Sequence, residues 1–280
     1  MKTPLALLAG IILVSLIACS GMDIGSVTRV VQQTFQAATP LSDEEEYYVG
    51  RAVAARILST YSLLEDRKLT EYVNLVGNTV AVNSDEPYTY GGYHFAVLNS
   101  EEINAFACPG GIILITKGML YATQNEDELA AVLAHEVAHI NNRDGVSAIQ
   151  KARLTEVATL IGKEAAQRYT PAELSQLVTA FEGSIDDVFK TLVVNGYSKT
   201  QEYRADEDAI TYLKRAGYDP YALKNFLVRL QSQGQGSTGG IMKTHPATSE
   251  RIARVEKELP SDQFDQSLVQ LRAKRFKKAL

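Results

Sequence analysis

The chain has 280 residues and a hydrophobic content of 45%, which is ordinary for a protein that buries a core and argues against disorder as its main state. Lys and Arg number 28 against 33 Asp and Glu, which gives a formal net charge of −5. A surface of this charge gives no electrostatic reason to expect nucleic acid as a partner, and the length suits one substantial domain or two small ones.

The first twenty residues, MKTPLALLAGIILVSLIACS, have the layout of a secretory signal. Lys2 supplies a positive start, and residues 5–18 form an apolar stretch of 14 residues. This is the length of a signal-peptide core and is too short to span a bilayer comfortably. We therefore expect residues 1–18 to be a signal peptide rather than part of the fold.

The end of this segment, Leu-Ile-Ala-Cys at 16–19, resembles the lipobox of bacterial lipoproteins, in which cleavage leaves the cysteine as a lipid-bearing N-terminus. Acyl chains on Cys19 would hold the protein on a membrane without a spanning helix. Ser20 resembles the signal that sorts such proteins to the outer membrane, so we expect a lipid-anchored protein on the periplasmic face of the bacterial cell envelope. A plain secretory signal or a short anchor helix is the alternative. If Cys19 is acylated, Cys108 is the remaining thiol and an intrachain disulfide is excluded.

Residues 19–40 are polar, with scattered Gly, Ser, Thr and Gln, and suit a tether between the lipid and a domain. A helix is predicted to start at Ser42, because Ser42 and Glu45 form a capping box ahead of an apolar run. A second helix is predicted over 66–82, where apolar side chains recur at helical spacing.

The pattern then changes to short β-rich segments at 93–98 and 112–115, which we interpret as strands of a small sheet. From residue 126 onward the period is helical, and the predicted segments are a helix over 126–142, a helical stretch over 145–195 broken near Thr170-Pro171, helices over 200–216 and 220–231, a loop at 232–240, a helix over 247–258 and a basic amphipathic tail. No stretch after residue 20 is apolar for long enough to span a membrane, and we find no internal repeat. The sequence therefore predicts one mostly helical α+β domain over 41–258 with one small sheet, followed by a C-terminal helical tail over 259–280.

Two of the four histidines lie in HEVAH, residues 135–139. Side chains four residues apart share one face of a helix, so the rings of His135 and His139 can converge on one Zn²⁺, and Glu136 can reach a water bound to it. A chance match to this pattern is expected on the order of once in a few hundred chains of this composition. The alternative is a pair of partly buried histidines that only satisfy neighbouring groups.

A catalytic zinc needs a third protein ligand and one open position. Asn142 and Gly145 stand where the metzincin pattern requires Gly and His, so that class is excluded. In SKTQEYRADEDA (198–209), Glu202 and Asp206 lie four apart on one helix face. Glu202 can ligate zinc while Asp206 accepts the second ring N–H of a ligating histidine. An acidic pair of this kind more often lies on a solvated helix face. The assignment of Glu202 and Asp206 to a zinc site therefore depends on the presence of HEVAH in the same chain.

Four segments carry a resemblance to a known family: NAFACPGG (104–111), HEVAH (135–139), EYRAD (202–206) and THPATSERI (244–252). Their order and rough spacing resemble those of the HtpX-like, BepA-like and CAAX prenyl protease zinc metalloendopeptidases, the gluzincins of peptidase family M48. The resemblance runs over roughly residues 41–258. It implies a mostly helical zincin metallopeptidase fold, with one small β-sheet beside the HExxH helix.

The resemblance also implies the roles of the central residues. One Zn²⁺ per chain is expected, with His135, His139 and Glu202 as its ligands. Glu136 is the implied general base, which activates the zinc-bound water and then hands its proton to the leaving amine. Asp206 is implied to support a ligating histidine.

Two further residues take roles from the resemblance alone. His245 resembles the family residue that donates a hydrogen bond to the oxyanion of the tetrahedral intermediate, and Arg251 resembles the arginine that orders the wall of the site. Without the resemblance, an ordinary loop at His245 and a surface ion pair at Arg251 are the simpler interpretations.

NAFACPGG resembles the edge strand on which such peptidases align their substrates. Backbone groups around Asn104, Ala105 and Phe106 are expected to pair with an extended peptide by strand addition, which implies unfolded segments as substrates. Cys108 has two interpretations: a small buried hydrophobe, which strand alternation favours, or a thiolate that occupies the open zinc position. His94 is expected to be a packing residue of its strand.

We expect a zinc endopeptidase that removes unfolded, misfolded or misassembled envelope proteins, with the outer-membrane assembly machinery as a partner. The alternative is a chaperone-like assembly factor that binds clients on the same strand with little proteolysis. The presence of Glu136 favours the enzyme, because a structural metal has no use for a base. Polar residues interrupt every apolar run between 145 and 200, which predicts a soluble helical lid over the cleft. The HtpX-like and prenyl proteases are integral membrane enzymes, so this difference weakens the inference that the chain cuts prenylated or membrane-spanning substrates.

Overall fold

The computed structural model describes residues 42–147, 185, 188–233, 240–261 and 264–280, which belong to one compact unit of the chain. The predicted signal peptide, Cys19, the tether, most of the predicted 145–200 lid and most of the 232–240 loop lie outside the described residues. Within the described ranges, no helix is both long and apolar enough to cross a membrane.

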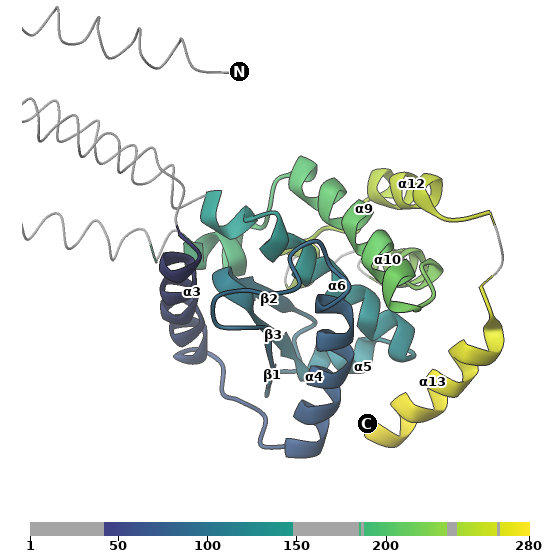
Figure 1. Ribbon diagram of the computed structural model, residues 1–280, viewed down its shortest axis with the longest axis horizontal. Helices are drawn as coiled ribbons and strands as arrows, with labels where there is room; N and C mark the ends of the chain where they lie inside the picture. The colour runs from purple at the N-terminus through teal and green to yellow at the C-terminus, as the bar shows by residue number, and fades with distance from the viewer. Residues whose placement is uncertain (1–41, 148–184, 186–187, 234–239, 262–263) are drawn as a thin grey trace, which may run out of the picture. The chain divides into compact units, whose positions relative to one another are not determined.

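Helices dominate the described part of the chain, and three short strands form one small sheet (Figure 1). In chain order the elements are α3 (Asp43–Leu58), α4 (Arg67–Ala81), β1 (His94–Leu98), β2 (Ala105–Cys108), the 3-10 turn η1 (Pro109–Gly111), β3 (Ile112–Thr116), α5 (Lys117–Ala122), α6 (Glu126–Asn141), the π-helical turn η2 (Thr191–Asn195), α9 (Lys199–Ala216), α10 (Tyr221–Gln233), α11 (Ile241–Thr244), α12 (Ser249–Glu258) and α13 (Gln266–Ala279). The predicted α+β class with one small sheet is therefore confirmed.

The sheet has the strand order β1-β3-β2, with β1 parallel and β2 antiparallel to β3. The strand β2 therefore forms one edge, as predicted for NAFACPGG. The turn between β2 and β3 depends on Gly110, whose φ of 76° suits glycine. A Cβ on Gly110 would also lie 2.5 Å from the Cα of Tyr47 in α3, so this turn and α3 can approach closely only with glycine.

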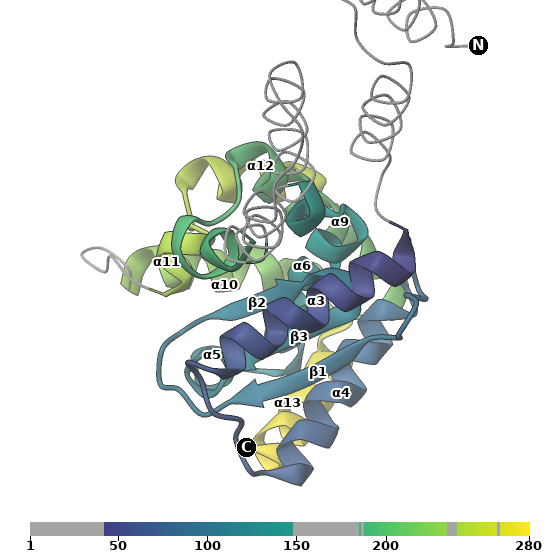
Figure 2. The same cartoon turned by 90° about the vertical axis from the view of Figure 1, so that its left-hand side faces the viewer.

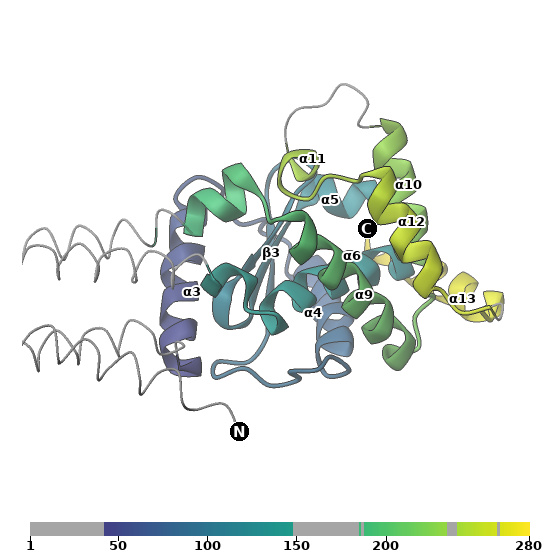
Figure 3. The ribbon, with the colours of Figure 1, turned by 90° about the horizontal axis from the view of Figure 1, so that it is seen from above.

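The sheet separates two apolar layers, because successive side chains of a strand point to opposite faces. On one face, Leu98, Phe106 and Leu114 pack against apolar residues of α3. On the other face, Ala107 and Ile113 pack with residues of α4 and α6. Figure 2 shows α3 lying across the near face of the sheet, and Figure 3 shows α9 running beside α6 with α12 next to it.

The helix α6 is buried on all sides, with every residue from Glu126 to Ile140 enclosed. The side chain of Asn125 caps its start by accepting a hydrogen bond from the backbone N–H of Glu128. The first turn, which we call the acidic turn, therefore buries three consecutive carboxylates: Glu126, Asp127 and Glu128. A helix N-terminus favours negative charge, but buried carboxylates also need cationic partners.

Three arginines from two other helices supply these partners. Arg272 of α13 holds Asp127 through two nitrogens, at 2.7 Å for the shortest contact, and Arg275 of α13 pairs with Glu126. Arg229 of α10 pairs with Glu128. The C-terminal helix, predicted as a basic helical tail without a packing partner, is thus bound to the start of α6 by these ion pairs.

Two short helices and one residue differ from the prediction. The short helices α5 and α11 were not predicted. His94, expected to pack, is exposed, and its ring Nε2 lies 2.9 Å from the carbonyl oxygen of Gly91. His94 lies on the same strand face as buried Leu98. It is the first residue of β1, however, and burial along this face increases only toward the end of the strand.

Candidate metal centre

The helix α6 places His135 and His139 one turn apart, as the spacing predicts. Their ring Nε2 atoms lie 3.1 Å from each other. Both side chains are buried, and their rings meet edge to face with centroids 4.6 Å apart. The pair therefore presents two nitrogen atoms to one point beside the helix.

The second nitrogen of each ring faces a carboxylate. His135 Nδ1 lies 3.0 Å from Asp206 Oδ1, and His139 Nδ1 lies 2.8 Å from Asp144 Oδ2. Asp144 accepts a hydrogen bond from His139 Nδ1, and Asp206 lies at ion-pair distance from His135 Nδ1. A carboxylate beside Nδ1 favours the tautomer with the proton there, so the Nε2 atoms keep their lone pairs for a metal. The partnership of Asp206 with a ring was predicted from the sequence. Asp144 was missed, although it follows His139 by only five residues, because nothing local shows that the chain turns back there.

The helix α9 brings the predicted third ligand. Ser198 and Gln201 form a capping box at its start, which places Glu202 in the first turn and Asp206 one turn later. Glu202 Oε1 lies 3.4 Å from His139 Nε2, and Oε2 lies 3.5 Å from His135 Nε2.

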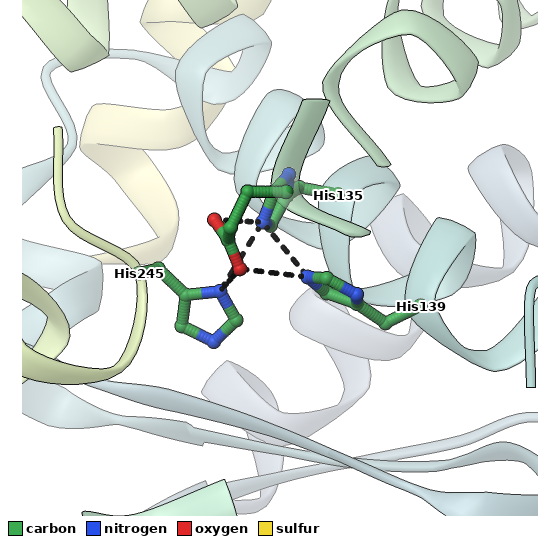
Figure 4. Close-up of side chains that lie close together, drawn as sticks. His135, His139 and His245 are labelled. Carbon is green, nitrogen blue, oxygen red and sulfur yellow. Dashed lines mark hydrogen bonds and ion pairs between the residues drawn. The ribbon is translucent and has the colours of Figure 1, made fainter. Parts of the chain in front are cut away.

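His245, just after α11, completes the cluster from a distant part of the sequence (Figure 4). Its Nδ1 lies 2.8 Å from Glu202 Oε1 and 3.3 Å from His135 Nε2. One donor atom from each of His135, His139, Glu202 and His245 lies within 4.8 Å of all the others. The structure thus brings together the three predicted ligands and adds a fourth donor.

This donor set fits a zinc ion. Bonds of about 2.0–2.1 Å in a tetrahedron separate the ligand atoms by about 3.3 Å. The separations that join the two Nε2 atoms to each other and to Glu202 run from 3.1 to 3.5 Å. Two nitrogen lone pairs facing each other at this distance repel unless a cation or a proton lies between them. Nitrogen and carboxylate donors in this geometry are typical of zinc.

Arg251 of α12 is buried behind the cluster, so its interpretation as a surface ion pair is wrong. Its guanidinium donates to both oxygens of Asp206, at 2.7 and 2.8 Å, and lies 2.6 Å from Glu202 Oε2. Burial alone would raise the pKa of Glu202, but the charges of His245 and Arg251 hold it well below its ordinary value. Burial opposed by Arg251 likewise leaves the pKa of Asp206 lowered. Both groups are therefore carboxylates at neutral pH.

The predicted base, Glu136, is completely buried. Neither carboxylate oxygen has a hydrogen-bond partner among the described residues. The nearest ring is that of His245, whose Nε2 lies 4.0 Å from Glu136 Oε1. Burying a carboxylate without partners costs free energy. An unpaired buried carboxylate is therefore typical of a group that takes part in a reaction.

Tyr197 belongs to the site and was missed by sequence reasoning. Its ring stacks on His139 with centroids 4.0 Å apart and meets His245 at 5.6 Å. The hydroxyl is buried and has no hydrogen-bond partner among the described residues. Burial, and next the negative charge of Glu136, raise the pKa of Tyr197 well above its ordinary value. Its place directly before the Ser198 cap of the Glu202 helix was the available signal.

The predicted substrate strand has a defined free edge. The backbone N–H of Thr116 donates to the carbonyl of Asn104 at 3.0 Å, so the alternation of an antiparallel ladder turns the backbone groups of Ala105 outward. That N–H now donates to Asn104 Oδ1 at 3.0 Å, and the hydroxyl of Thr244 lies 3.3 Å from the same oxygen. Phe106 points into the layer beneath α3. The substrate-binding role of these residues stays a prediction.

Cys108 is fully buried among apolar side chains, as the packing interpretation expects. It is not among the converging donor atoms of the described residues, so the structure gives the thiolate latch no support. Burial raises the pKa of its thiol, which therefore remains protonated.

A metal-free chain is expected to lose stability as pH rises from about 6.5 to 10. Burial lowers the pKa of His135, but hydrogen bonds to Asp206 and Glu202 outweigh it and raise the pKa to about 10. A histidine with a pKa of about 6.5 in the unfolded chain and a higher pKa in the folded chain stabilises the folded state. This stabilisation is fully present when the pH is below the unfolded-state pKa. That stabilisation disappears as pH rises through the folded value. Thermal melts in chelator across this range check the slope, and Asp206→Asn should flatten it. A metal-free melting temperature independent of pH would contradict the assignment.

Buried histidines on the HExxH helix, a carboxylate ligand from a second helix and a small sheet with a free edge together define a zincin metallopeptidase. The sequence profile of peptidase family M48 matches residues 67–259. The chain therefore belongs to peptidase family M48 and to its class of enzymes, the zinc metalloendopeptidases.

The chain is similar to several named proteases. The chain is 29% identical to the beta-barrel assembly-enhancing protease of Yersinia pestis over 219 residues, which cover 78% of this chain and 44% of that protein. The corresponding protein of Escherichia coli K12 is 28% identical over the same shares. Metalloprotease LoiP of Escherichia coli K12 is 24% identical over 271 residues, 94% of this chain and 99% of that protein. The chain thus spans less than half the length of the two assembly-enhancing proteases.

Proposed function

We propose that this chain hydrolyses peptide bonds in unfolded or misassembled proteins of the bacterial cell envelope. His135, His139 and Glu202 hold one Zn²⁺, and Glu136 is the general base. The observation that supports this proposal most directly is the cluster of donors with lone pairs facing one point, beside a buried carboxylate that has no partner among the described residues.

The residues around the metal divide the reaction between them. When bound, zinc polarises a water molecule and the scissile carbonyl. Glu136 accepts a proton from the attacking water and passes it to the leaving amine. Asp206 and Asp144 hold the two rings in the tautomer that keeps their Nε2 lone pairs free. Arg251 keeps Asp206 charged and in place.

His245 cannot fill the fourth place in the donor cluster and donate to the oxyanion at the same time. A catalytic metal needs an open position, whereas His245 Nδ1 now fills the fourth place in the donor set. Its proposed donation to the oxyanion therefore requires that the ring withdraw from the cluster. The withdrawal would leave that place for water.

The proposed substrates follow from the free edge of β2. An extended peptide can pair with the outward backbone groups of Ala105, once the side chain of Asn104 releases the N–H. Pairing of this kind requires an unfolded segment. The names of the two assembly-enhancing relatives support envelope proteins and their assembly machinery as partners, and the lipobox at Cys19 supports a lipid anchor on the periplasmic face.

Glu202→Ala is expected to lower the zinc content of the purified chain well below one per chain. The substitution removes a ligand and leaves Arg251 and the histidine rings without their shared carboxylate. Metal analysis after dialysis checks this. The matched control is Glu207→Ala, a half-exposed glutamate on the same helix, which should retain zinc. Equal zinc in both variants would refute the ligand assignment.

The function itself is tested by cleavage of casein, an unfolded protein, by the purified full-length chain. Cleavage that stops in a chelator and returns with Zn²⁺ is the expected result. A chain that holds zinc but cleaves nothing, while it still binds unfolded polypeptide, would instead favour the chaperone-like alternative.

A further inference from the structure

The hydroxyl of Tyr197 has no assigned task in the site. It is buried, and no described residue accepts or donates a hydrogen bond to it. Leaving a buried hydroxyl unpaired costs free energy, so such a group typically has a partner outside the chain, such as a bound ligand or a water molecule. The four converging donor atoms belong to His135, His139, Glu202 and His245.

The ring is held by rigid neighbours. One face stacks on His139, a residue of α6, with an interplanar angle of 23°. Its backbone N–H donates to the carbonyl of Thr244 at 3.4 Å, and Ser198 begins α9 immediately afterwards. The hydroxyl is therefore anchored by the same two helices that carry the metal ligands.

The hydroxyl lies close to the segment that follows α6. Gly145, which packs against Pro109 at the end of β2, has no side chain there, and a Cβ on it would lie 3.9 Å from the hydroxyl oxygen. Glu136 is close enough to act electrostatically on the hydroxyl. The hydroxyl therefore lies near Pro109, which follows the strand that is proposed to align substrate, and within reach of the charge on Glu136.

Two unpartnered polar groups thus share this part of the site: the Glu136 carboxylate, which can only accept, and the Tyr197 hydroxyl, which can donate. Hydrolysis of a peptide bond offers the complementary pair, an attacking water that gives up a proton and a carbonyl oxygen that gains negative charge. A donor that meets the developing oxyanion stabilises the transition state more than the bound substrate.

We propose that the Tyr197 hydroxyl donates a hydrogen bond to the oxyanion of the tetrahedral intermediate, an inference that rests on the proposed peptidase function. Tyr197 then performs, alone or beside His245, the task that the sequence assigns to His245. In this structure His245 directs Nδ1 into the donor cluster, whereas the Tyr197 hydroxyl is already free to donate.

The test compares Tyr197→Phe with wild type in the full-length chain. The substitution removes one hydroxyl and keeps the ring that stacks on His139. Tyr203→Phe is the matched control, because it removes another phenolic hydroxyl that has no hydrogen-bond partner among the described residues. The ring of Tyr203 lies against Arg254 rather than on a histidine of the cluster. The readouts are zinc content, kcat and KM on an unfolded peptide, and affinity for a peptide phosphinate, which mimics the tetrahedral intermediate.

For Tyr197→Phe we expect full zinc content and a kcat lower by about 100- to 1000-fold, as for loss of an oxyanion donor, with little change in KM. The phosphinate should bind more weakly by a comparable factor, while Tyr203→Phe matches wild type. A kcat within twofold of wild type, or unchanged phosphinate affinity, would overturn the proposal. Failure of the proposed peptidase function would give a different result, because wild type itself would then cleave nothing. The phosphinate affinities of zinc-loaded wild type and Tyr197→Phe would still show whether the hydroxyl contacts a tetrahedral group.

Discussion

Glu136→Gln is expected to retain one zinc per chain and to lose at least about a hundredfold in cleavage rate, because a positioned general base contributes about 10²- to 10⁴-fold. The amide has nearly the shape of the carboxylate but cannot accept the proton of the attacking water. Glu136 is not among the four converging donors, so the metal should remain. Its oxygens have no partners among the described residues, so the change breaks no protein hydrogen bond.

Zinc analysis and casein cleavage on the same preparation check this expectation. Glu207→Gln, on the surface of α9, controls for the loss of one negative charge. A Glu136→Gln chain that cleaves at the wild-type rate would remove Glu136 from the mechanism. Loss of zinc together with activity would instead mean that Glu136 supports the metal.

Arg272→Leu is expected to destabilise the chain by about 3–5 kcal/mol, the usual cost of removing one partner from a buried ion pair. Asp127 is buried at 1% exposure, and Arg272 is exposed by only 12%, so the remaining carboxylate would lose its guanidinium without gaining water. Among the described residues, Asp127 would then keep the hydrogen bond from the backbone N–H of Asp219, at 2.9 Å, as its remaining polar contact. The start of the HExxH helix would therefore carry an uncompensated buried charge.

Urea unfolding of the zinc-loaded chain measures this loss. Asp127→Asn in the Arg272→Leu background should recover part of the stability, because the amide oxygen still accepts from Asp219 and the buried charge is gone. Arg67→Leu is the contrast: its partner Glu71 is on the surface of α4 and both side chains are mostly exposed, so the unfolding midpoint should not move. Equal midpoints for Arg272→Leu and wild type would show that α13 does not stabilise α6.

The parts of the site that depend on one helix could be predicted from the sequence. The four-residue spacing of His135 and His139 places both rings on one face, and the same spacing places Glu202 beside Asp206. Helical periodicity also predicted α4 and α6 within a residue or two of their ends. These features are local, since they follow from 3.6 residues per turn and from caps such as Asp66 and Asn125.

The partners of these residues could not be predicted in the same way. Asp144, on His139, and Tyr197, stacked on the same ring, depend on where the chain turns after α6 and how it enters α9. The acidic turn would pass for a solvated helix start in any local analysis. It is buried only because arginines 101 to 149 residues away along the chain reach it.

The sequence by itself determined the histidine pair of the HExxH helix, the acidic pair on α9, the small sheet with its edge strand and the class of enzyme, because each depends on short-range spacing or on linked motifs. Only the tertiary structure decided that His245 joins the donor cluster, that Arg251 is buried against Asp206, and that Tyr197 and Glu136 remain without partners among the described residues. These outcomes depend on which surfaces meet when α6, α9 and the segment before α12 pack together. Packing fixes such distances between residues that no local rule relates.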